Sequence, residues 1–94
     1  MTTKRPYIVL SEQDNVATVV QDVSAGEAVD TDAGALAMRQ RIPYGHKFAL
    51  RAIPAGGYVV KYGAQIGRAT AQILAGDHVH VHNVEDIVDE VRKR

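Results

Sequence analysis

The sequence predicts a small, mostly β domain with one α-helix at its C-terminal end. Three observations predict this fold: a turn-forming octet that occurs four times, short β-branched or aromatic segments beside the octets, and an amphipathic helical pattern after them. The chain has 94 residues, 46% of them hydrophobic, with one Phe and no Trp, so the core must come mainly from Val, Ile, Leu and Ala. We expect a single domain over 1–94, with a β core at about 6–82 and the helix at about 84–92.

The recurring octets share the pattern x-[VI]-x-[AY]-G-x-x-[VF]. They are DVSAGEAV (22–29), RIPYGHKF (41–48), AIPAGGYV (52–59) and QILAGDHV (72–79). Their irregular spacing indicates a local structure used four times rather than a solenoid. Within IPAG (53–56), Pro54 suits the second position of a type I turn, and Gly56 suits the fourth, where a positive φ costs little. Each octet should end one strand and start the next, with tight turns at Gly26, Gly45, Gly56 and Gly76.

Short segments rich in β-branched and aromatic residues are predicted to be strands. They are YIVL (7–10), VATVV (16–20), KFALRAI (47–53), YVVKY (58–62) and HVHVH (78–82). The segment DTDAGALAMRQ (30–40) has an ambiguous pattern, which we interpret as a loop followed by a strand. Gly63 and Gly67 lack the G-x-G-x-x-G spacing of a phosphate-binding loop, so we interpret them as residues that the backbone path requires.

The C-terminal segment NVEDIVDEVRKR (83–94) has the pattern of an amphipathic helix. Its apolar residues Val84, Ile87, Val88 and Val91 recur at helical spacing, and Asn83 suits the N-cap. Acidic residues come early and basic ones late, as the helix dipole favours. We expect the apolar stripe to cover the β core rather than to dock on another chain.

Composition excludes several classes of function. Eleven basic and eleven acidic residues cancel, so the chain lacks the positive charge expected of a nucleic-acid binder or of a protein that binds anionic membranes. There is no cysteine for disulfides or thiolate metal sites, no signal-peptide pattern, and no apolar run long enough to cross a bilayer. We expect a cytoplasmic protein with neither nucleic acid nor membrane as a partner.

Three of the four histidines alternate with valine in AGDHVHVHN (75–83). In a strand, His78, His80 and His82 would share one face, and the valines would form the buried side. At about 3.3 Å per residue, the backbones of His78 and His82 would lie roughly 13 Å apart, too far for both side chains to ligate one ion without help. Neighbouring histidines of the strand could share a metal if ligands from elsewhere completed its coordination. Three interpretations remain open: an exposed polar face, a substrate or partner contact, and a metal site at His78 and His80.

A second candidate site lies in GHKFAL (45–50), where Gly45 turns the chain and presents His46 and Lys47 at a strand start. The Lys47 side chain could hold a carboxylate or sulfonate, and His46 could donate a hydrogen bond or move a proton. A solvated turn is the alternative. The sequence contains no arrangement that predicts a Ser/His/Asp or Cys/His nucleophile or a desolvated carboxylate pair.

Three motifs together resemble the SAF domain of the altronate and galactarate dehydratases. They are DNVATVV (14–20), IPYGHKFAL (42–50) and VVKYGAQIGRATAQILAGDHVHVHN (59–83). The chain is also similar to the separate small subunits of altronate dehydratase and (2R)-sulfolactate sulfo-lyase. The resemblance implies a β-clip fold and membership in a lyase that eliminates water or sulfite from a sugar acid or hydroxy acid. It also implies a divalent metal, iron or manganese, in the assembled enzyme, held mainly by a large subunit.

On this resemblance, the residues expected to face an active site are His46, Lys47, His78, His80, His82 and Asn83. The resemblance assigns no catalytic residue and does not choose among altronate, galactarate and sulfolactate. Our preferred hypothesis is a small subunit that supplies substrate or interface contacts to a large catalytic subunit and has no lyase activity alone. The alternative is a non-catalytic SAF module that binds a carbohydrate or acidic ligand by itself.

Overall fold

The structure, a computed structural model, describes residues 5–87. Over this range the chain forms strands, turns and irregular segments and no helix, so the mostly β fold is confirmed. None of these residues therefore forms a helix long and apolar enough to cross a membrane. The strands are β1 (Tyr7–Ile8), β2 (Val16–Val19), β3 (Ala28–Thr31), β4 (Gly34–Ala37), β5 (Lys47–Ala49), β6 (Tyr58–Lys61), β7 (Ala64–Ala69), β8 (His78–Val79) and β9 (Val84–Glu85).

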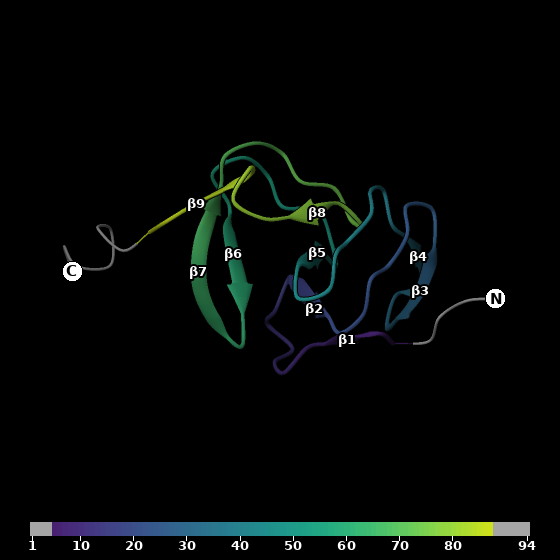
Figure 1. Cartoon of the computed structure of the whole chain (residues 1–94). Coiled ribbons are helices and arrows are strands. Elements are labelled where there is room, and N and C mark those ends of the chain that lie inside the picture. Colours follow the sequence, from purple (N-terminus) through teal and green to yellow (C-terminus); the bar gives the residue numbers. More distant parts are fainter. Residues whose placement is uncertain (1–4, 88–94) are drawn as a thin grey trace.

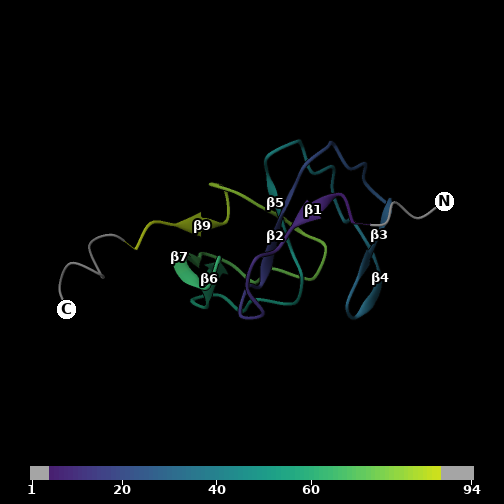
Figure 2. The ribbon, with the colours of Figure 1, turned by 90° about the horizontal axis from the view of Figure 1, so that it is seen from below.

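The strands form three antiparallel sheets. The central sheet has the order β1-β2-β5-β8, and strands distant in sequence are neighbours within it. The β3–β4 hairpin lies to one side of this sheet, and the sheet β6-β7-β9 lies to the other, as both views show (Figure 1, Figure 2). The strand expected in the second part of segment 30–40 is confirmed as β4. The part before it is the end of β3 and a tight turn rather than a loop, so the segment belongs to a hairpin.

The four octet turns occur where they were predicted. Gly26, Gly45, Gly56 and Gly76 all have φ between +81° and +88°. The turn type differs from the prediction, however. The hydrogen bond that closes the Pro54 turn runs from Gly57 N–H to Pro54 O, 2.8 Å, so Pro54 occupies the first position and Gly56 the third. A positive φ at the third position is the requirement of a type II turn, so the predicted type I turn is wrong.

The octets also build the core, in pairs. Val23 and Ile42 form one antiparallel bridge, and Ile53 and Ile73 form another, in each case at the second octet position. All four side chains are at most 2% exposed. The first pair packs in one apolar cluster with Phe48, and the second packs in another cluster with the buried valines of the later octets. The expectation of a core built mainly from Val, Ile and Ala is confirmed, with Phe48 and Met38 as its largest members, but none of the described Leu residues is fully buried.

The predicted C-terminal helix does not begin where the sequence placed it. Val84 and Glu85 form β9, which pairs with Arg68 and Ala69 of β7. Val84 also packs against the second core cluster, so burial and strand pairing outweigh the local helical pattern. The rest of the predicted helix, residues 88–92, lies outside the described residues.

Gly63 and Gly67 have the backbone roles that were predicted. Tyr62 and Gly63 link β6 to β7 with φ of 56° and 75°, the two positive values of a type I′ hairpin. Gly67 lies where β9 crosses close to β7, because a Cβ there would collide with the Val84 side chain and approach the Glu85 carbonyl. The first glycine permits the hairpin, and the second permits β9 to pair.

Candidate functional site

The pairing of β5 with β8 brings both histidine motifs to one place. Phe48 is opposite His78 in the antiparallel register, so two residues further along His46 is opposite His80. The His46 and His80 rings stack with centroids 4.1 Å apart, and His46 and His78 stack at 5.0 Å. Two candidate sites that the sequence left separate are therefore one cluster of imidazoles.

The three rings offer nitrogens that converge. His46 Nδ1 and His78 Nε2 share a hydrogen bond of 2.8 Å, in which one ring donates and the other accepts. One nitrogen from each of His46, His78 and His80 lies within 4.8 Å of the others. This is a donor set that can hold a transition metal ion, and it contains His46 in addition to the predicted pair.

His82 joins the cluster by a route that differs from the prediction. Strand β8 ends at Val79, and residues 81–83 form a turn, so the His82 ring returns to within 5.1 Å of the His78 ring. The predicted strand through residue 82 is wrong, because the strand ends at Val79. The predicted backbone separation of roughly 13 Å assumed a continuous strand, and the turn instead lets the two rings approach each other. Val79 is fully buried as predicted, but Val81, placed in the turn, is 82% exposed.

Asn83 holds this turn closed. Its Oδ1 accepts a hydrogen bond of 3.0 Å from the His80 N–H, and its Nδ2 donates one of 2.9 Å to the His78 carbonyl. The predicted N-cap role is therefore replaced by bonds to residues that precede Asn83. Through these bonds Asn83 positions the backbone of two histidines.

The surroundings keep two of the imidazoles neutral. Burial lowers the pKa of His78 to about 4, with further contributions from His82 and His46. The pKa of His80 is also lowered, chiefly by burial and then by His46. Neutral imidazoles have a free lone pair, which can accept a proton or bind a metal at neutral pH.

A hollow of about 240 Å³ lies beside the cluster. Its lining includes Lys47 and His80 from the histidine motifs, the carboxylates Glu85 and Asp86, and the apolar Ile66, Val81 and Val84. Burial lowers the pKa of Lys47, and the nearby charge of Lys61 lowers it further. A basic side chain, an imidazole and carboxylates thus share one small opening, an arrangement suited to a small acid that carries hydroxyl groups.

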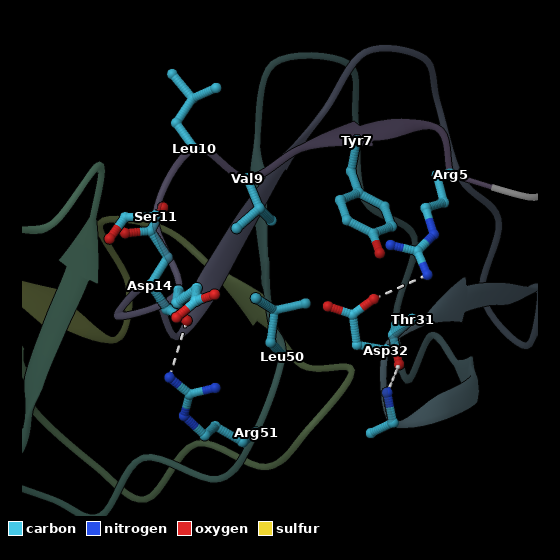
Figure 3. Close-up of a pocket in the computed structure, with 12 residues that line it drawn as sticks. Arg5, Tyr7, Val9, Leu10, Ser11, Asp14, Thr31, Asp32, Leu50 and Arg51 are labelled. Atoms are coloured by element: carbon cyan, nitrogen blue, oxygen red, sulfur yellow. Dashed lines mark hydrogen bonds and ion pairs between the residues drawn. The ribbon is translucent and has the colours of Figure 1, made fainter.

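A larger cavity of about 380 Å³ lies at the opposite edge of the central sheet, beside β1 (Figure 3). Both of its arginines bond within the protein: Arg5 pairs with Asp32 at 2.9 Å, and Arg51 donates to the Asp14 backbone carbonyl oxygen at 2.9 Å. The Asp14 side chain, which is 2% exposed, accepts the Gly63 N–H at 2.8 Å and so anchors the β6–β7 hairpin. The Asp-Asn pair before the strand is a turn signal in the sequence, but the sequence pattern does not predict the bond between Asp14 and the distant Gly63.

A family model and the curated relatives that match this chain point to the same family. The model for the SAF domain of altronate/galactarate dehydratases matches residues 5–87. Altronate dehydratase of Escherichia coli K12 is 47% identical over 77 residues, which are 82% of this chain and 16% of that protein. The (2R)-sulfolactate sulfo-lyase subunit alpha of Chromohalobacter salexigens is 37% identical over 86 residues, covering 84% of this chain and 92% of that subunit. Galactarate dehydratase (L-threo-forming) of Escherichia coli K12 is 38% identical over 73 residues, and the chain spans 14% of its length.

Proposed function

Because this chain belongs to the SAF-domain family of the altronate and galactarate dehydratases, we propose that it is the small subunit of a two-component carbon–oxygen or carbon–sulfur lyase. Its partner is a large catalytic subunit, and its substrate is a small sugar acid or hydroxy acid. The observation that carries the proposal is the cluster of His46, His78 and His80 beside the hollow that contains Lys47. The similarity to a sulfo-lyase subunit over 92% of that subunit's length supports the two-component arrangement.

The proposed division of labour follows from what an elimination requires. A base must remove the proton alpha to the carboxylate, charge must be stabilised at that carbon, and hydroxide or sulfite must be helped to leave. Lys47 is suited to hold the substrate carboxylate, and the neutral His80, whose lone pair is free, is suited either to accept a proton or to hold a metal ion beside the substrate. His46 and His78 stack with His80 beside the hollow, and Asn83 positions the turn next to His80.

The remaining requirements are assigned to the large subunit. An iron or manganese ion held mainly there would act as a Lewis acid that helps the leaving group depart. The hollow on this chain is an open surface feature with room for part of a substrate, so the partner must close it and exclude water. His82, whose side chain is exposed at the rim of the cluster, is proposed to contact the partner or the substrate. We place the assembly in the cytoplasm, in keeping with the absence of cysteine.

A domain exchange tests this function. The segment of Escherichia coli altronate dehydratase that matches this chain is replaced by residues 5–87, and dehydration of altronate is measured. The hybrid should be active, and the hybrid with both His46→Ala and His78→Ala should lose at least about tenfold in kcat/KM. Gln65→Ala, an exposed position on β7, is the matched control. A folded double variant as active as its parent hybrid would contradict the proposal.

A further inference from the structure

We infer that His46, His78 and His80 bind one divalent transition metal ion that this chain holds without its partner, with a coordination position open toward the neighbouring hollow. The inference goes beyond the proposed function, because it concerns a metal site on the small subunit itself. It holds whichever acid the assembled enzyme uses.

The site is built on anchored backbone. His46 ends an octet turn: its N–H donates to the Pro43 carbonyl at 2.9 Å, and its own carbonyl accepts the Val19 N–H at 2.9 Å. The His78 N–H donates to Gln40 Oε1 at 2.8 Å, and the His80 N–H is bonded to Asn83. Each ligand therefore extends from a backbone position that is already held, which lowers the entropy lost when an ion binds.

The donor geometry fits an ion after a small movement. Two nitrogens bound to one ion at about 2.0–2.1 Å in tetrahedral geometry lie roughly 3.4 Å apart. The three imidazole nitrogens already lie within 4.8 Å of one another, and His46 Nδ1 and His78 Nε2 are 2.8 Å apart. All three side chains are half-buried at the surface, so their rings can tilt toward a common point. The proton in the His46–His78 hydrogen bond leaves to solvent when the ion binds.

The ligand type indicates the class of ion. Three imidazoles without a thiolate suit zinc, iron, cobalt or nickel rather than calcium or magnesium, which take oxygen ligands. Three protein ligands leave a tetrahedral ion one position for an exogenous ligand. Because His80 also lines the neighbouring hollow, the open position would face it. Lys47 in that lining would attract a carboxylate, and Glu85 and Asp86 would accept hydrogen bonds from hydroxyl groups of the same ligand. The ligand class for the open position is therefore a small carboxylic acid.

Cobalt(II) is the probe for the test, because its visible absorption reports both binding and coordination number. The full chain, without a histidine tag, is titrated with cobalt(II) after treatment with a chelator. We expect a single ion per chain with the absorption of a four- or five-coordinate nitrogen site. His46→Ala and His78→Ala should each weaken binding by at least about tenfold, since loss of a ligand should cost no less than loss of a residue that only orients one.

His82→Ala is the matched control, because the His82 ring lies tilted beside His78 but does not belong to the converging set. It should bind cobalt(II) like the unaltered chain. Thermal unfolding of each variant without metal verifies that the fold is retained. Adding acetate to the cobalt-loaded chain should shift its visible band. Absence of saturable binding, or binding that survives both His46→Ala and His78→Ala in folded protein, would overturn the metal site, and an unchanged band would overturn the open position.

Discussion

Four imidazole rings share the β5–β8 edge of the central sheet, so their protonation states depend on one another. A proton added to His78 would lie beside His46, His80 and His82 and would be partly removed from water. Like charges and burial both disfavour the protonated form. The cluster is therefore arranged to keep lone pairs available at neutral pH, as both a proton acceptor and a metal ligand require.

Proton NMR of the histidine rings tests whether the protonated form of His78 is disfavoured. In the chain kept free of metal by a chelator, His78 should titrate near pH 4, well below the ordinary histidine pKa of 6.5. In the unfolded chain His78 takes up its proton at higher pH than in the folded chain, so the free energy of unfolding should fall as pH falls from 6.5 to about 4. His46→Ala should move the His78 pKa upward. A His78 pKa at or above 6.5 in the folded chain would contradict the arrangement.

The sequence contained every member of the cluster but not their convergence. Alternation in a strand correctly predicted that His78 and His80 share a side. That His46 stacks on His80 depends on the β5–β8 register, which local pattern cannot supply for strands some thirty residues apart. That His82 returns to His78 depends on Asn83, whose side chain bonds backward rather than forward along the chain.

At the scale of elements, the octet turn is the unit that the fold repeats. Its apolar second and eighth positions are buried in all four copies, and its glycine has a positive φ in all four. The pattern was readable from sequence because each requirement is local: a residue without Cβ at the turn and an apolar residue on either side. Which octets pair with each other was not readable, since that is set by the tertiary fold.

Replacing the turn glycines should destabilise the fold to different extents. Gly56→Val should lower the free energy of unfolding by roughly 1–2 kcal/mol, the cost of a left-handed conformation for an L-residue, because a Cβ there meets open space. Gly76→Val should cost clearly more, because its Cβ would also lie 2.5 Å from the Ala37 carbonyl oxygen. Urea unfolding measures both. Equal losses of stability, or a smaller loss for Gly76→Val, would contradict the close contact between Gly76 and the Ala37 carbonyl oxygen.

The turn that carries the histidines should depend on Asn83. Asn83→Ala removes the hydrogen bonds to His80 N–H and His78 O, and should cost about 1–3 kcal/mol of stability. Hydrogen exchange at the His80 amide should accelerate accordingly. Asn83→Asp keeps an acceptor for that amide and is the matched control, with slower exchange than the alanine variant. Identical exchange in all three proteins would refute the positioning role.

The predicted helix illustrates why a local pattern can fail. Val84 and Ile87 have helical spacing, and both are at least partly buried, as a helix stripe would be. Yet Val84 reaches the core as part of β9, whose pairing with β7 requires that Gly67 have no side chain. A glycine seventeen residues earlier in the chain thus permits this strand, and it lies outside the segment 83–94 whose pattern predicted the helix.

At the scale of the whole molecule, the histidine site lies on an outer strand rather than in an enclosed core. The interior is filled by two apolar clusters to which each pair of octets contributes, and β8 is the last strand of the central sheet. The larger cavity lies at the far edge of that sheet, where Arg5 pairs with Asp32 and Arg51 donates to the Asp14 backbone carbonyl. A face of this kind can offer ligands to a substrate but cannot exclude water from it, which is the physical reason why we propose a partner subunit.

Turnover by reconstituted enzyme tests the central claim most directly. The purified chain is assayed with altronate, galactarate and sulfolactate, with iron(II) or manganese(II) supplied, first alone and then with the large lyase subunit. We predict no elimination by the chain alone, and elimination of water or sulfite from one of these acids in the mixture. In the mixture, His46→Ala with His78→Ala should reduce the rate by at least about tenfold. Rapid elimination by the isolated chain, or an elimination rate in the mixture that the two histidine substitutions leave unchanged, would contradict the account.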